Sequence, residues 1–220
     1  MNWVIIPEYI SLLFVFIMLF FSRELYTDKT LKTKLFRLFL WYVFFEIIIS
    51  IISLIAIEYY WIVPGIVNNL IQLLFFLTGP LMSLFFVFYL ITVIWEEDKN
   101  IKIYFRLAAI PSILYISLVI TNPLTGLIYG INENNGFSYG QGFLFSYLPT
   151  VLYFSAILFV AWIKRKSLDS FLKKVMIIFP LLSMILIGIQ MIFPKVILSS
   201  TVAAYCVPFV KTRISESKCA

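Results

Sequence analysis

Glu46 is an acidic side chain within the apolar sequence FFEIII. A carboxyl group is costly in such a setting, and it usually faces a bundle interior or water. Burial disfavours its charged form, so a dry Glu46 is expected to be protonated. In that position Glu46 could hydrogen-bond a ligand or change its protonation state during a conformational switch. A neutral carboxyl group bonded to a neighbouring helix is the alternative interpretation.

Asn68, Asn69 and Gln72 form a second polar group within an apolar run. Residues three and four apart share a face of a helix, so Gln72 lies on the same face as both asparagines. Such amides can line a polar pocket, and more often they join helices in lipid, each contributing roughly 1 kcal/mol. Gln190 and Glu8 have the same two interpretations, and Glu8 is also near the external edge, where snorkelling to water would explain it.

Other chemistry is not supported by the residue types. The chain has no His, which removes His-based metal sites and Ser–His catalysis. The last apolar run has no mid-way Lys for a retinal Schiff base, and no apolar run has the paired acids of an intramembrane aspartic protease. Phosphate-binding loops, dinucleotide fingerprints and nucleophile elbows are also missing. We therefore expect no enzyme, no metal and no cofactor.

The elements that position these side chains are membrane-spanning helices. Hydrophobic residues make up 62% of the chain and charged residues 13%, with a mean hydropathy of +1.01. Such a chain is too apolar for a soluble domain of 220 residues. A helix needs about 20 apolar residues to cross the hydrocarbon core. The apolar runs predict spans near residues 3–22, 35–57, 65–94, 103–121, 142–163, 175–193 and 196–210.

Two of these spans are unusual in length. The third is long and contains Thr78-Gly79-Pro80 near its middle, yet two helices there would each be too short to cross. We expect one tilted or kinked helix. The seventh run, 196–210, is short and includes Pro208, so it is the least regular of the seven.

Positive charge gives the orientation of the helices. Sixteen of the seventeen Lys and Arg residues fall into four clusters, which follow the first, third, fifth and last apolar runs. Because cytoplasmic loops hold the positive charge, this alternation predicts an N-terminus outside and a C-terminus inside. The net charge of +6 lies in short loops at the membrane edge, where it would meet lipid headgroups rather than nucleic acid.

The longest connection between spans, residues 122–141, lies on the side opposite the basic loops. Leu127, Tyr129 and Ile131 alternate, as do Phe137 and Tyr139, around a turn-forming Asn-Asn-Gly. This pattern predicts a β-hairpin. A structured external loop often carries function, although it could also be a polar cap over helix ends.

The arrangement resembles the seven-helix N-terminal membrane region of bacterial GGDEF diguanylate cyclases and of some sensor histidine kinases. The resemblance rests on the predicted seven-span plan, on MNWVIIPEYISLLFVFIMLFFSRE, on FFEIIISIISLIAIEYYWIVP and above all on LVITNPLTGLIYGINENNGFSYGQGFLFSYL. In the last stretch an Asn-Pro beginning at Asn122 ends the fourth span, and a Tyr-x-x-Gly beginning at Tyr139 leads into the fifth. Asn122 and Tyr139 therefore join the candidate ligand-binding or switch residues.

The resemblance implies a receptor that senses an external or membrane-borne cue and passes it through its last helix to a cytosolic effector. Such signalling also implies a homodimer. The chain has no Gly-Gly-Asp-Glu-Phe sequence and no kinase domain, and its ending, VPFVKTRISESKCA, is unlike a signalling helix. A truncation or a frameshift of the reading frame would explain that ending.

We therefore expect an all-α integral membrane bundle in the inner (plasma) membrane. Residues 1–210 would form a seven-helix sensor-like domain, and residues 211–220 a short cytoplasmic tail. Its expected partners are the lipid bilayer, a small-molecule or membrane cue, and a separate effector. A small transporter or permease subunit is the alternative function, although the sequence has no internal repeat of the kind that transporter folds often show. A structural membrane partner of another subunit is the third.

Overall fold

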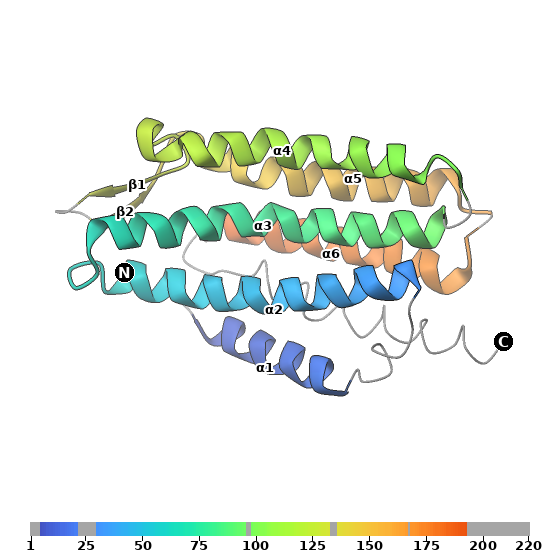
Figure 1. Cartoon of the computed structure of the whole chain (residues 1–220), viewed down its shortest axis with the longest axis horizontal. Helices are drawn as coiled ribbons and strands as arrows, with labels where there is room; N and C mark the ends of the chain where they lie inside the picture. The colour runs from blue at the N-terminus through green and yellow to red at the C-terminus, as the bar shows by residue number, and fades with distance from the viewer. Residues whose placement is uncertain (1–4, 22–29, 96–97, 133–135, 167, 193–220) are drawn as a thin grey trace.

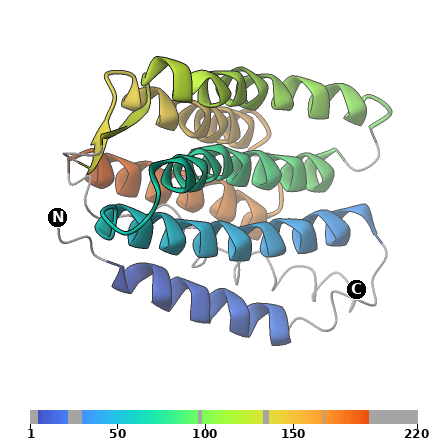
Figure 2. The same cartoon turned by 60° about the vertical axis from the view of Figure 1, so that its left-hand side comes forward.

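The computed structural model describes residues 5–21, 30–95, 98–132, 136–166 and 168–192. In these residues six α-helices lie side by side, and a two-stranded hairpin lies at one end (Figures 1 and 2). The elements in chain order are α1 (Ile6–Phe21), α2 (Leu31–Glu58), α3 (Gly65–Ile94), α4 (Ile101–Thr125), β1 (Tyr129–Asn132), β2 (Gly136–Tyr139), the 3-10 helix η2 (Phe143–Tyr147), α5 (Leu148–Ile163) and α6 (Ser170–Ile192).

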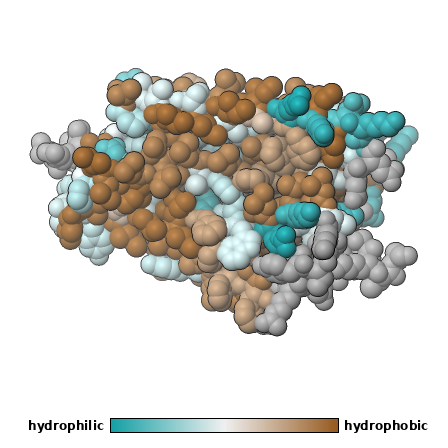
Figure 3. All heavy atoms as spheres, in the orientation of Figure 1, coloured by the Kyte–Doolittle hydropathy of each residue, from teal (hydrophilic) through white to brown (hydrophobic). Residues whose placement is uncertain are grey.

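Five segments are long and apolar enough to cross a membrane: Leu31–Glu58, Gly65–Ile94, Ile101–Thr125, Phe143–Ile163 and Leu172–Ile192. Their outer faces carry many large apolar side chains, which water would not favour but lipid would (Figure 3). The chain is therefore a multi-pass membrane protein, and five of the seven predicted spans are confirmed.

The structure does not confirm the other two predicted spans. The first corresponds to α1, which has 16 residues and is about 24 Å long at 1.5 Å per residue. That is shorter than the roughly 30 Å of a hydrocarbon core. The predicted seventh span, 196–210, and the tail that follows it lie outside the described residues.

All Lys and Arg residues that the structure describes lie at one end of the bundle, which we call the basic end; the hairpin lies at the other, the hairpin end (Figure 1). These residues are Lys32, Lys34, Arg37, Lys99, Lys102, Arg106, Lys164, Arg165, Lys166, Lys173 and Lys174. Two apolar runs separate each basic cluster from the next basic cluster. Because neighbouring helices are antiparallel, two crossings return the chain to the same end of the bundle.

Helix α3 is at the centre of the bundle and packs against α2, α4, α5, β1 and η2. It is one continuous helix of 30 residues with Pro80 inside it, as predicted from its length. The hydroxyl of Tyr42 on α2 donates to the carbonyl of Thr78, two residues before the proline, at 2.8 Å. Further along α3, Phe86 meets Phe179 of α6 with ring centroids 4.2 Å apart.

Helix α4 has Pro111 within it, and a side chain of α5 bonds to its backbone beside the proline. The hydroxyl of Tyr153 donates to the carbonyl of Ala108 at 2.7 Å and accepts from the backbone N–H of Ser112 at 3.2 Å. A proline weakens the hydrogen-bond ladder of a helix, and in lipid the affected groups need other partners. Tyr153 therefore supports the backbone of α4 and joins it to α5.

The predicted β-hairpin is present as an antiparallel pair with Tyr129 opposite Tyr139 and Ile131 opposite Phe137. Asn122, near the end of α4, holds its first strand in place. The Asn122 amide donates to the carbonyl of Tyr129 at 2.9 Å, and its oxygen accepts from the backbone N–H of Ile128 at 2.6 Å. Ile128 and Tyr129 are buried in an apolar cluster with Val119 of α4, so the hairpin is packed onto the helices.

Candidate functional site

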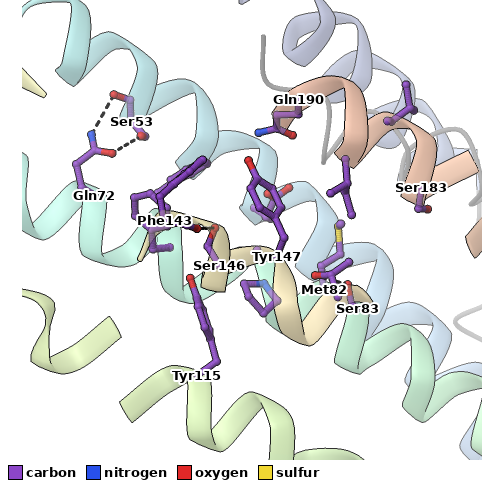
Figure 4. Close-up of a pocket in the computed structure, with 18 of the residues that line it drawn as sticks. Ser53, Gln72, Met82, Ser83, Tyr115, Phe143, Ser146, Tyr147, Ser183 and Gln190 are labelled. Atoms are coloured by element: carbon purple, nitrogen blue, oxygen red, sulfur yellow. Dashed lines mark hydrogen bonds between the residues drawn. The ribbon is translucent and has the colours of Figure 1, made fainter. Parts of the chain in front are cut away.

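A cavity of about 90 Å³ lies inside the bundle, between the hairpin end and the middle of the helices (Figure 4). Residues of α2, α3, α4, α5, α6, β2 and η2 line it, so most of the described elements meet there. Four of the predicted site residues contribute to its wall: Glu46, Gln72, Tyr139 and Gln190.

Three of the polar residues that line the cavity have a buried polar atom with no hydrogen-bond partner among the described residues. They are Glu46 through Oε2, Gln190 through Oε1 and Tyr115 through its hydroxyl. Their side chains are only 1%, 7% and 3% exposed, so bulk water does not reach them freely. A buried polar group without a partner costs roughly 1–3 kcal/mol, and such groups call for a ligand or ordered water. This cavity therefore has the polar groups of a binding site.

Aromatic rings make the wall of the cavity nearest the hairpin. Phe143 contacts Tyr139 with centroids 4.0 Å apart, Tyr147 at 5.4 Å and Phe76 at 6.3 Å, and Phe137 contacts Tyr139 at 5.1 Å. In the view of Figure 4, Phe143 and Tyr147 of η2 lie between Gln190 of α6 and Tyr115 of α4. Because these contacts link β2 to η2 and α3, a ligand against the rings would touch the hairpin and the helices together.

The phenol of Tyr139 is neutral in this setting. Burial, and secondarily the nearby phenol of Tyr147, raises the pKa of Tyr139 above its ordinary value. The hairpin therefore contributes a hydrogen-bonding hydroxyl group to the cavity, and no charge.

Gln72 has a different role from Glu46, since its amide is already engaged between α2 and α3. Ser53 donates to its oxygen at 2.8 Å, and its nitrogen donates to the carbonyl of Ser53 and to the side-chain oxygen of Asn68, both at 3.3 Å (Figure 4). Asn68 in turn donates to the carbonyl of Ala56 at 3.3 Å. These bonds favour the interpretation of Asn68 and Gln72 as polar residues that join two helices.

Asn69 and Asn122 do not reach the cavity wall. The backbone carbonyl of Asn69 accepts from the Tyr129 hydroxyl at 3.2 Å, and the side chain of Asn122 is engaged with the hairpin backbone. Both residues therefore position the hairpin. Glu8 on α1 is fully buried and lies near enough to Glu46 to interact with it electrostatically.

Sequence analysis missed Tyr115, Tyr147 and Phe143. A tyrosine hydroxyl midway along an apolar run, as in the ILYISL around Tyr115, was a usable signal, because tyrosines of membrane proteins gather at the interfaces. Tyr147 and Phe143 gave no such signal, since they stand near the start of a span where aromatic rings are common.

The described residues contain no cluster of His, Cys, Asp and Glu that could hold a metal ion. Comparison of the chain with protein-family models, with curated proteins and with solved structures gives no significant match.

Proposed function

We propose that the chain is a membrane sensory module that binds a small molecule in the cavity and relays this event to a cytosolic effector. The observation that carries the proposal is the buried cavity with unpartnered polar atoms on α2, α4 and α6. The resemblance to the membrane regions of diguanylate cyclases and histidine kinases agrees with it, and either enzyme would be the effector. The chain itself would have no catalytic activity.

The proposed orientation places the hairpin end outside the inner membrane and the basic end in the cytosol. Short loops rich in Lys and Arg remain on the cytoplasmic side, and the described Lys and Arg residues all lie at the basic end. The cue would then enter from outside, past the hairpin, and reach the cavity beneath it.

The mechanism would be a shift between two packings of the bundle. Helix α6 contributes Ser183, Ile187 and Gln190 to the cavity and also runs to the basic end. A ligand that bonds Gln190 and Glu46 more strongly in one packing would favour that packing and move α6 against α3. The contact between Phe86 and Phe179 is one point where α6 would slide.

A thermal-stability screen of the purified protein tests the proposal. Some extracellular small molecule should raise the melting temperature, and Glu46→Gln should change that response. If a broad screen of charged and neutral compounds leaves the melting temperatures of both proteins unchanged, the sensory function is contradicted.

A small transporter or permease subunit is the second candidate, and Glu46 is the observation that favours it. A carboxyl group beside a cavity near the membrane midplane is typical of substrate and proton pathways. If the protein carries a solute into proteoliposomes and Glu46→Ala abolishes this flux, transport is favoured over sensing. A structural membrane partner would show neither ligand-induced stabilisation nor flux.

A further inference from the structure

We infer that the ligand of this cavity is a small organic cation of the alkylammonium class, held by Glu46 and Gln190 against the tyrosine and phenylalanine rings. This inference rests on the proposed function and names the chemistry of its ligand.

The first argument is the character of the unpartnered atoms. Glu46 and Gln190 each present an oxygen that has no hydrogen-bond partner in the described part of the chain, and both oxygens can accept a hydrogen bond. Glu46 is the only carboxyl group among the described residues that line the cavity, and none of those residues is Lys or Arg. A bound cation would favour the ionised form of this carboxyl group, because an opposite charge nearby stabilises a carboxylate. A ligand that donates hydrogen bonds and carries a positive charge complements such a site.

The surroundings of Glu46 add to this electrostatic preference. The groups that interact with it electrostatically are Glu8 on α1 and Tyr42 on its own helix. An anionic ligand would meet no Lys or Arg among the described residues that line the cavity, whereas a cation would favour the ionised form of Glu46, which is expected to be protonated when dry.

The second argument is the aromatic wall. Phe76, Tyr139, Phe143 and Tyr147 surround the part of the cavity next to the hairpin, and neighbouring ring centroids are 4.0–6.3 Å apart. Aromatic faces attract ammonium groups, and this attraction is strongest where the cation is desolvated. Several rings beside one carboxyl group are typical of alkylammonium recognition.

The third argument is size. The cavity volume of about 90 Å³ is below the roughly 150 Å³ of a cavity that admits benzene. A ligand of a few heavy atoms fits this space, whereas a drug-sized or sugar-sized molecule does not.

Saturation-transfer NMR tests the inference on the full chain in deuterated detergent. The probes are trimethylammonium chloride and, as a neutral molecule of similar size, tert-butanol, both at constant ionic strength. The variants are Glu46→Gln, Gln190→Leu and Glu58→Gln. Glu58→Gln is the matched control, because Glu58 is also on α2 and its Oε2 is also buried without a partner, yet it does not line the cavity.

We expect trimethylammonium to bind the wild type and Glu58→Gln equally, and Glu46→Gln at least tenfold more weakly. Gln190→Leu should also weaken binding, which keeps the test decisive if Glu46→Gln fails to fold. Any of three results would overturn the inference. They are equal binding of trimethylammonium by the wild type and both cavity variants, stronger binding of tert-butanol than of trimethylammonium, and no binding of trimethylammonium at all. A neutral compound that stabilises the wild type in the thermal screen but not Glu46→Gln would overturn the cationic ligand and leave the sensory function standing.

Discussion

Gln72 and Glu46 lie on neighbouring helices and line the same cavity, but their hydrogen bonding differs. Each hydrogen-bonding group of Gln72 has a partner on α2 or α3, whereas one oxygen of Glu46 has none. A polar group whose bonds are satisfied within the bundle stabilises helix packing, and a buried group without a partner is available to a ligand. This difference separates structural residues from candidate binding residues in one site.

Substitution of Gln72 by Leu should reduce the free energy of unfolding by about 1 kcal/mol, the usual size of an interhelical hydrogen bond in lipid. The physical reason is that Ser53 and Asn68 lose their shared partner. Unfolding of the variant in mixed micelles measures the change. Asn69→Leu is the control, because the bond of Asn69 to Tyr129 uses its backbone carbonyl. Equal destabilisation by both variants would contradict the structural role of Gln72.

The apolar runs predicted which polar residues are unusual, but not which of these residues lie together in the fold. Glu46, Gln72 and Gln190 stand out because each is polar in an apolar run, and all three line the cavity. Their partners depend on how each helix is rotated about its axis, which hydropathy does not give. Ser53 and Tyr115 were missed for this reason.

The hairpin is the element of the connection between α4 and α5 that reaches the cavity. Phe137 and Tyr139 of β2 line the cavity, while Asn122 and the apolar cluster around Ile128 hold β1 to α4. At its base, the backbone N–H of Gly140 donates to the carbonyl of Ile128 at 2.8 Å, and a Cβ at this position would collide with the carbonyl of Leu127. The close approach of two backbone segments therefore requires glycine at position 140.

Gly140→Ala should destabilise the protein by about 1–3 kcal/mol, because the added methyl group forces the base of the hairpin apart. It should also weaken ligand-induced stabilisation, since Tyr139 moves with the strand. Gly188→Ala on α6 is the control, because a Cβ there meets nothing within 4 Å. Thermal unfolding compares the two variants; a stability of Gly140→Ala equal to that of Gly188→Ala would show that the base of the hairpin tolerates a side chain.

The elements themselves were largely predictable. Length and hydropathy predicted seven spans, of which five are confirmed, including α3 as one helix through Pro80, and alternation around a turn predicted the hairpin. The same signals did not predict the 3-10 helix η2 ahead of α5, because a short 3-10 turn has no hydropathy period of its own. Two residues of η2, Phe143 and Tyr147, belong to the aromatic wall, so part of the site was missed with it.

For the whole molecule, the separation of charge between two ends underlies the proposed orientation. The described Lys and Arg residues lie at the basic end, and the hairpin lies at the other. Under the positive-inside rule, this separation of charge would place the basic end in the cytosol and the hairpin in contact with external solutes.

This orientation can be tested with single cysteines, introduced by Ser138→Cys or by Lys166→Cys. The background chain has its native cysteines, Cys206 and Cys219, replaced by Ser. Positions 138 and 166 are both exposed, the first on the hairpin and the second at the basic end. In intact cells a membrane-impermeant maleimide should label the cysteine at 138, and the cysteine at 166 only after lysis. The opposite pattern would reverse the orientation and place the hairpin end in the cytosol.

If the chain is a sensor, occupancy of the cavity changes the packing of α6, and a distance between spin labels on α2 and α6 measures that change. Lys34 on α2 and Lys174 on α6 are exposed at the basic end and suit labelling in the same Cys206→Ser, Cys219→Ser background. The distance should be measured with and without the compound that most raises the melting temperature of the wild type. We expect the distance distribution to shift in the wild-type cavity and not in Glu46→Gln. An identical distribution with the cavity of the wild type occupied would contradict the sensory mechanism.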